Sequence, residues 1–128
     1  MRVGLLEDDL AIREMLLLVL EDEGCIVTAY PDAEGCLQAL GITALEPVLP
    51  PIDFLIVDWR LNGDLSGTEV IRQIRTKPHL SSLPVILTTA ATFDNIKELQ
   101  DLHVTLLEKP FSVDEIAKLI ENISHPIP

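Results

Sequence analysis

The chain has 128 residues, 48% of them hydrophobic, and its 21 acidic and 9 basic residues give a formal net charge of −12. This size fits one domain with a proper core, which we expect to span residues 1–128, with Ser124–Pro128 as a tail or the start of a linker. The negative charge repels nucleic acid and anionic membrane surfaces, so no direct binding to either is expected. Cys25 and Cys36 match neither a CxxC metal motif nor a disulfide framework, and no signal-peptide pattern is present. These features indicate a reducing cytoplasm.

Strand-like and helix-like patterns alternate along the first half of the chain. In order, we predict a strand at 2–6, a helix with apolar positions at 12–20, a strand at 26–30, a helix at 32–40 and a proline-containing loop at 41–51. Gly24 follows the first helix as its C-terminal stop, and Asp32 is the expected N-cap of the second. The first predicted strand ends at an acidic trio of residues, 7–9.

The second half continues the same alternation. We predict a strand at 52–57, a helix at 68–75, a strand at 84–89, a short helix at 94–102, a strand at 104–107 and a helix at 112–123. The strand at 52–57 is an almost unbroken apolar run, as expected of a strand covered on both faces. Ser112 as N-cap, with Glu115 three residues later, forms a capping box that starts the last helix.

This alternation predicts an α/β fold, a parallel sheet with helices on both faces. Ligands of such folds bind beyond the carboxyl ends of the strands, where this chain places polar residues after apolar runs. They are Glu7, Asp8, Asp58, Thr89 and Lys109. Three carboxylates can hold a divalent cation such as Mg²⁺, while a hydroxyl and an ammonium can hold phosphoryl oxygens. The set predicts a phosphorylation site.

Each of these residues also has an ordinary explanation when taken alone. Asp8 or Asp9 could cap the first helix, and Asp58 could end its strand in a turn. Thr89 could fill a strand, and Lys109 could be a solvated surface charge. Only the combination, in this order along the chain, favours a functional site over these explanations.

Four segments of the chain resemble the receiver domains of bacterial-type response regulators, the phosphoacceptors of two-component signalling. These segments are LLEDDLAIREML, FLIVDWRLNGDLSG, PVILTTAA and EKPF, and the resemblance covers nearly the whole chain. It implies a single receiver domain with a flavodoxin-like, doubly wound (βα)5 fold. The five parallel strands would then take the order 2-1-3-4-5.

The resemblance also implies roles for individual residues. Asp58 would accept a phosphoryl group from a histidine kinase or phosphotransfer protein, and the domain would then switch its binding to a downstream protein or output domain. The implied Mg²⁺ ligands are Glu7, Asp8, Asp58 and the backbone carbonyl of Arg60. The implied phosphoryl-binding groups are Thr89, Lys109 and the backbone N–H of Ala90. Such a module is a signalling phosphoacceptor, expected to phosphorylate itself from a donor and to dephosphorylate itself, and is not classed as an enzyme.

Two alternatives from other functional classes remain. A hydrolase of the haloacid-dehalogenase kind also uses an aspartate nucleophile with Mg²⁺, but it needs a second Asp two residues later, where this chain has Arg60. A receiver-like module that binds a partner without phosphorylation would be expected to lose acidic or lysine positions, and all of them are present.

Leu106 occupies the position at which many receivers carry an aromatic residue, the partner of the threonine, here Thr89, in the conformational switch.

Overall fold

The computed structural model describes residues 1–41, 52–61, 63, 65–89 and 101–124. Its five strands form one parallel sheet in the order β2-β1-β3-β4-β5. The strands are β1 (Arg2–Leu6), β2 (Ile26–Ala29), β3 (Phe54–Asp58), β4 (Val85–Thr89) and β5 (Thr105–Glu108). The helices are α1 (Leu10–Asp22), α2 (Ala33–Ala39), α3 (Gly67–Arg75), the short 3-10 helix η1 (Pro78–Leu80) and α5 (Val113–Ser124). The predicted α/β fold and strand order are therefore confirmed.

Some predicted boundaries were wrong by one or two residues. The third strand begins at Phe54, not at residue 52, and it includes Asp58. Asp53 lies just before it, where its backbone N–H donates to the carbonyl of Arg2 at 2.7 Å. The prediction missed η1, whose Pro78 favours a turn. Of the predicted helix at 94–102, residues 101–102 are helical and the rest lies outside the described residues, as does most of the predicted loop at 41–51.

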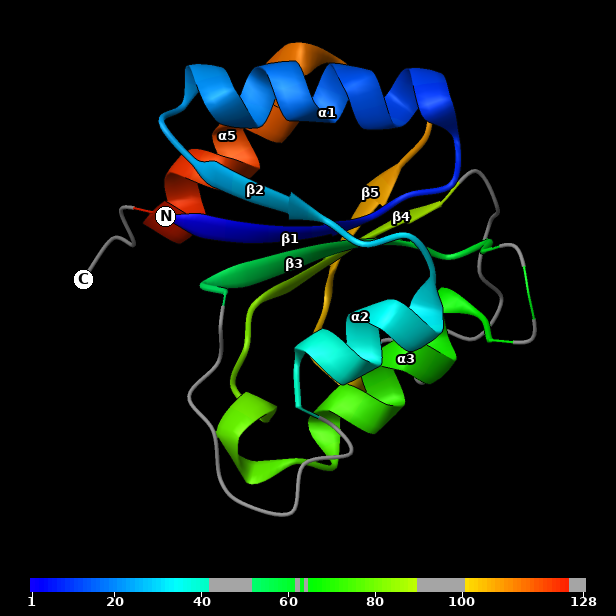
Figure 1. Ribbon diagram of the computed structural model, residues 1–128. Helices are drawn as coiled ribbons and strands as arrows, with labels where there is room; N and C mark the ends of the chain where they lie inside the picture. Colours follow the sequence, from blue (N-terminus) through cyan, green and yellow to red (C-terminus); the bar gives the residue numbers. More distant parts are fainter. Residues whose placement is uncertain (42–51, 62, 64, 90–100, 125–128) are drawn as a thin grey trace.

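Helices cover the sheet on both faces, with α1 and α5 on one side and α2 and α3 on the other (Figure 1). Side chains alternate along each strand, so the sheet separates two buried clusters. Leu55 and Val57 of β3 point to the α2 and α3 side, and Phe54 and Ile56 point to the α1 and α5 side. All five residues of β3 are buried, which explains the unbroken apolar run in its sequence.

Side-chain caps explain where the helices begin. Of the two predicted candidates, Asp9 caps α1 by accepting from the N–H of Ile12 at 3.1 Å. Asp32 caps α2 as predicted. The predicted capping box is also confirmed, because Glu115 N–H donates to Ser112 Oγ and Ser112 N–H donates to Glu115 Oε1. These local signals act within three residues, so sequence alone identifies them.

Arg75 fastens the end of α3 to the loops at the amino end of the sheet. Its guanidinium donates to five backbone carbonyls, at distances of 2.6 to 3.3 Å, from Leu80, Ser81, Leu83, Leu102 and His103. Burial lowers the pKa of Arg75 from its ordinary value. The side chain therefore serves as a structural clamp between segments that are far apart in sequence.

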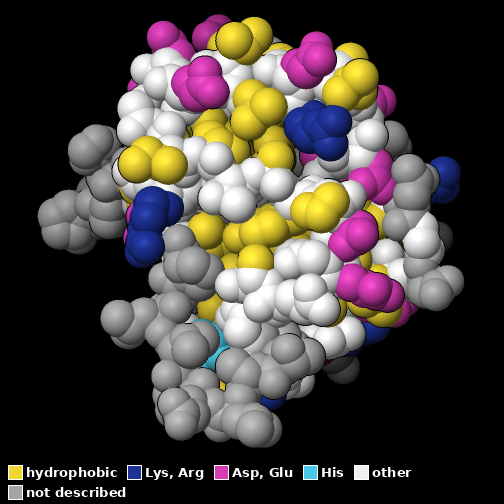
Figure 2. Space-filling model, viewed as in Figure 1, with side chains coloured by type: hydrophobic (Ala, Val, Ile, Leu, Met, Phe, Trp, Pro, Cys, Tyr) yellow, Lys and Arg dark blue, Asp and Glu magenta, His cyan; other side chains and the backbone are white. Residues whose placement is uncertain are grey.

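The surface reflects the acidic composition. Figure 2 shows Asp and Glu side chains spread over the visible face, with hydrophobic side chains among them. Leu18 of α1 and Ile26 of the edge strand β2 are the most exposed large hydrophobic side chains, at 69% and 70%. None of the helices in the described ranges has the length and apolarity needed to span a bilayer.

Candidate functional site

The candidate site lies at the carboxyl edge of the sheet, where the parallel strands all end. Glu7 directly follows β1, Asp58 is the last residue of β3, and Lys109 directly follows β5. Asp58 pairs with Thr88 in the parallel register of β3 and β4. Each of these side chains projects toward the α1 and α5 face because alternation along the strands places it there. Residues more than 50 positions apart in sequence are thereby brought together.

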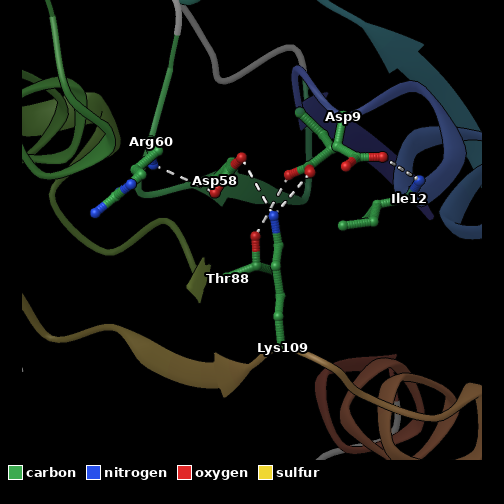
Figure 3. Close-up of polar contacts among 7 residues, drawn as sticks. Asp9, Ile12, Asp58, Arg60, Thr88 and Lys109 are labelled. Carbon is green, nitrogen blue, oxygen red and sulfur yellow. Dashed lines mark hydrogen bonds and ion pairs between the residues drawn. The ribbon is translucent and has the colours of Figure 1, made fainter. Parts of the chain in front are cut away.

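The ammonium group of Lys109 joins two carboxylates in this cluster. Its Nζ lies 2.9 Å from Glu7 Oε1 and 3.3 Å from Asp58 Oδ2. Figure 3 shows the Lys109 side chain extending toward Asp58, with Thr88 directed to the same centre. The backbone N–H of Lys109 donates to the carbonyl of Thr89 at 2.7 Å, and a cis peptide bond joins Lys109 to Pro110. The lysine is thus held at both its backbone and its side chain.

The cluster is short of positive charge, because two carboxylates share one ammonium. Glu7 is 1% exposed, and this burial raises its pKa from 4.5 to about 7. The hydrogen bond from Lys109 opposes that shift, and the negative charge of Asp58 adds to it. Burial disfavours the ammonium of Lys109, but the hydrogen bond and charge of Glu7, followed by those of Asp58, outweigh burial and raise the lysine pKa. An additional cation would therefore be favoured here.

The turn after β3 holds Asp58 from the opposite side. The backbone N–H of Arg60 donates to Asp58 Oδ1 at 3.3 Å, and that of Gly67 donates to the carbonyl of Trp59 at 2.9 Å. A methyl group at Gly67 would overlap the backbone carbonyl oxygen of Asp58 and lie 2.9 Å from the Cα of Trp59. A glycine is therefore required where α3 starts, because the chain passes directly over the end of β3.

A cavity of about 440 Å³ opens beside this turn. Within it the Arg60 guanidinium lies 5.4 Å from the centre of the Trp59 ring, a cation–π contact. Its described lining residues are Trp59, Arg60, Leu61, Gly63, Leu65, Ser66 and Glu69. Trp59 directly follows Asp58 in the sequence, and its indole packs at the edge of the buried cluster beneath α2 and α3.

The structure brings three of the predicted site residues into one cluster of contacts. Glu7, Asp58 and Lys109 are in direct contact. Thr89 is buried at the end of β4, 1% exposed, and Asp8 is half-buried in the turn before α1. Ala90, whose N–H was predicted to bind a phosphoryl oxygen, lies outside the described residues.

Sequence reasoning missed Thr88. Its hydroxyl lies 3.5 Å from Glu7 Oε2, on the buried side of the cluster. The sequence did contain a signal, because two polar residues, Thr88 and Thr89, follow one another at the end of an apolar strand. Adjacent residues of a strand point to opposite faces of the sheet. One of two adjacent threonines must then face the side that carries Glu7.

The donor groups fit a hard divalent cation in their chemistry. Glu7 and Asp58 offer carboxylate oxygens, the ligand type that Mg²⁺ prefers, and together they exceed the charge of Lys109. The described residues contain no group of three or more Asp, Glu, His or Cys side chains placed to hold a metal ion. The role of Glu7, Asp8 and Asp58 as a ligand set stays a prediction.

Comparisons with known proteins agree on one family. The model of the response regulator receiver domain matches residues 3–121. The chain is 32% identical over 127 residues to the chemotaxis protein CheY of Pseudomonas aeruginosa, covering 96% of this chain and 95% of CheY. It is 27% identical over 128 residues to the phosphate regulon transcriptional regulatory protein PhoB of Escherichia coli, covering 98% of this chain but 52% of PhoB. The chain thus spans about half of PhoB.

A solved structure supports the fold. The receiver domain of a sensor histidine kinase from Pseudomonas aeruginosa PAO1, which holds a magnesium ion coordinated in its active-site cleft, matches with a TM-score of 0.75. The match covers 96% of this chain and 97% of that domain, at 24% identity. Likeness at this level of identity establishes the shared arrangement of strands and helices.

Proposed function

Because the chain belongs to the family of response regulator receiver domains, we propose that it is the phosphoacceptor of a two-component or phosphorelay pathway, with Asp58 as the accepting residue. Receiver domains are signalling phosphoacceptors and are generally not classed as enzymes. The observation that carries the proposal is the ammonium of Lys109, which lies 3.3 Å from Asp58 Oδ2. At this position the ammonium would bind the negatively charged oxygens of a phosphoryl group on Asp58.

The proposed transfer needs little covalent chemistry from the protein. A carboxylate oxygen of Asp58 attacks the phosphorus of the donor, and the bond from phosphorus to the donor atom breaks, leaving its electron pair on the donor. Lys109 exchanges its contact with the Asp58 carboxylate for one with a phosphoryl oxygen. Thr89 and the N–H of Ala90 hold another oxygen. Positioning and charge stabilisation account for most catalysis of phosphoryl transfer, so these few groups suffice.

Magnesium belongs to the proposal as well. Glu7, Asp8 and Asp58, with the backbone carbonyl of Arg60, would hold the ion. When bound, Mg²⁺ supplies positive charge that neutralises the carboxylate and phosphoryl oxygens. The support for this role is the excess negative charge of the buried pair, because the two carboxylates share the Lys109 ammonium within the described part of the chain.

The partners follow from the same chemistry. The donor would be a histidine kinase or a phosphotransfer protein, and phosphorylation would change binding to a downstream protein or an output domain. The formal charge of −12 disfavours direct contact with nucleic acid, so the signal would pass through protein contacts. The cytoplasm is the proposed location, where such donors have access to the site.

The acceptor can be tested by mass spectrometry after incubation with Mg²⁺ and acetyl phosphate. We expect the wild-type chain to gain one labile phosphoryl group and the Asp58→Asn variant to gain none. Asp53→Asn is the matched control, because Asp53 lies just before the same strand but pairs with Arg2 at the opposite edge of the sheet. Labelling of Asp58→Asn, or loss of labelling in Asp53→Asn, would contradict the assignment.

The single tryptophan gives a second readout of the same proposal. Trp59 follows Asp58 directly, so its fluorescence should change on addition of Mg²⁺ and again, more slowly, on addition of acetyl phosphate. We expect Asp58→Asn to lose the second change. No change in fluorescence together with no mass gain would instead favour a module that binds its partner without phosphorylation.

A further inference from the structure

Thr88 places a buried hydroxyl group on the α1 and α5 face of the sheet, between the apolar cluster and the polar residues of the site. Its side chain is 0% exposed. Two residues earlier in β4, Ile86 points to the same face and packs in the buried cluster beneath α1 and α5. A buried hydroxyl without a partner costs about 1–3 kcal/mol, so its hydrogen bond decides whether the position tolerates a threonine.

The partner of this hydroxyl is Glu7. Thr88 Oγ1 lies 3.5 Å from Glu7 Oε2, while Lys109 Nζ lies 2.9 Å from Glu7 Oε1. The ammonium and the hydroxyl thus donate to different oxygens of the Glu7 carboxylate. The ammonium contact is short, whereas the hydroxyl contact is at the long limit of a hydrogen bond. The hydroxyl therefore contributes more to the orientation of the Glu7 carboxylate than to the strength with which it is held.

We propose that Thr88 is a positioning residue for the metal site, with its hydroxyl holding the Glu7 carboxylate in the orientation that receives Mg²⁺. The inference rests on the proposed function, in which Glu7 is a ligand of that ion. Groups that hydrogen-bond to metal ligands fix the orientation of those ligands and commonly alter metal affinity.

The hydrogen bond from Thr88 to Glu7 becomes more important when Asp58 is phosphorylated. Lys109 contacts both Glu7 and Asp58, so turning toward a phosphoryl group on Asp58 draws the ammonium away from Glu7. Thr88 and Lys109 both donate side-chain hydrogen bonds to Glu7. The Thr88 hydroxyl is then a donor that stays with the carboxylate throughout the transfer.

Two substitutions separate this role from simple packing. Thr88→Val keeps the β-branched shape and removes the hydroxyl, whereas Thr88→Ser keeps the hydroxyl and removes a methyl group. If Thr88 only fills space, valine should be silent and serine should perturb the protein. If the hydroxyl positions Glu7, valine should weaken the metal site and serine should preserve it.

The measurement is the Mg²⁺ dissociation constant of the full chain, by isothermal titration calorimetry without a phosphodonor. We expect Thr88→Val to raise the dissociation constant roughly tenfold, the lower end for groups that support a metal ligand, since the contact is long. Thr88→Ser should stay near the wild-type value. Thr76→Val is the control, because its hydroxyl donates to Gln73 at the far end of α3.

A double-mutant cycle tests whether Thr88 acts through Glu7. In the Glu7→Ala background, Thr88→Val should no longer change Mg²⁺ affinity, because the carboxylate that it positions is gone. An undiminished effect there would overturn the inference. An unchanged Mg²⁺ dissociation constant in Thr88→Val would also overturn it. If Thr88→Val does not fold, weaker Mg²⁺ binding by a folded Thr88→Ser variant would overturn it instead. Absence of Mg²⁺ binding by the wild-type chain would instead defeat the proposed metal site itself.

Discussion

Replacing Glu7 by glutamine should stabilise the metal-free protein at pH 8 and leave its stability nearly unchanged at pH 4.5. Glutamine has almost the shape of a protonated glutamate but carries no charge at any pH. Glu7 is 1% exposed, and burial raises its pKa to about 7. The variant therefore isolates the free energy of placing an ionised carboxylate in this buried cluster.

The magnitude comes from the difference between the folded and unfolded pKa values of Glu7. The folded chain holds the Glu7 proton more tightly than the unfolded chain, whose pKa is near 4.5. Protonated Glu7 therefore contributes stability below pH 4.5, and this contribution is lost as the pH rises through about 7. The difference in pKa corresponds to about 3 kcal/mol of unfolding free energy, as an upper limit. For a domain of this length it amounts to roughly 10 °C in melting temperature.

The assay is urea denaturation at a series of pH values between 4.5 and 8, with EDTA present to remove divalent ions. The quantity of interest is the unfolding free energy of Glu7→Gln minus that of the wild-type chain, since ionisation of all other groups largely cancels in this difference. Glu14→Gln is the control, because Glu14 is exposed on α1 and its replacement should give a nearly flat difference.

Two outcomes would contradict the predicted cost of ionising the buried Glu7 carboxylate. If the wild-type chain gains stability relative to Glu7→Gln as the pH rises from 4.5 to 8, then the ion pair with Lys109 outweighs the cost of burying the carboxylate. A difference that stays constant with pH would equally contradict it, because Glu7 would then titrate alike in the folded and unfolded chains.

Three further substitutions test the surrounding scaffold. Gly67→Ala should destabilise the protein by about 3 kcal/mol and reduce phosphorylation from acetyl phosphate, because the added methyl group overlaps the Asp58 carbonyl; urea denaturation and mass spectrometry measure the two effects. Arg75→Met should cost about 3 kcal/mol in urea denaturation, since five backbone carbonyls lose their donor. Asp32→Ala should lower the unfolding free energy by about 1 kcal/mol through loss of the cap on α2, without changing Mg²⁺ affinity.

Each of these substitutions has a matched control. Gly35→Ala, in α2, would place its methyl group no closer than 3.1 Å to any neighbour and should be far milder than Gly67→Ala. Arg72→Met removes an exposed arginine from α3 and should cost much less than Arg75→Met. Asp32→Asn should keep most of the cap. Equal losses within any of these pairs would show that the named contact is not the cause.

Patterns that depend on neighbouring residues were readable from the sequence. The continuous apolar run of β3 indicates that this strand is buried on both faces. Asp32 and Ser112 are N-cap residues that mark the starts of α2 and α5. These signals are local because strand alternation and helix capping act over two to four residues. The family resemblance then supplied the strand order, which no local pattern specifies.

The α/β class, most of the elements and the polar residues that end the strands can be predicted from sequence, because backbone geometry ties these features to short-range patterns. Three contacts required the folded structure: Lys109 joins Glu7 to Asp58, the Thr88 hydroxyl meets Glu7, and Arg75 binds the loops at the opposite edge of the sheet. These contacts link residues up to 102 positions apart. They exist because parallel strands align their ends, and sheet register then sets which side chains meet.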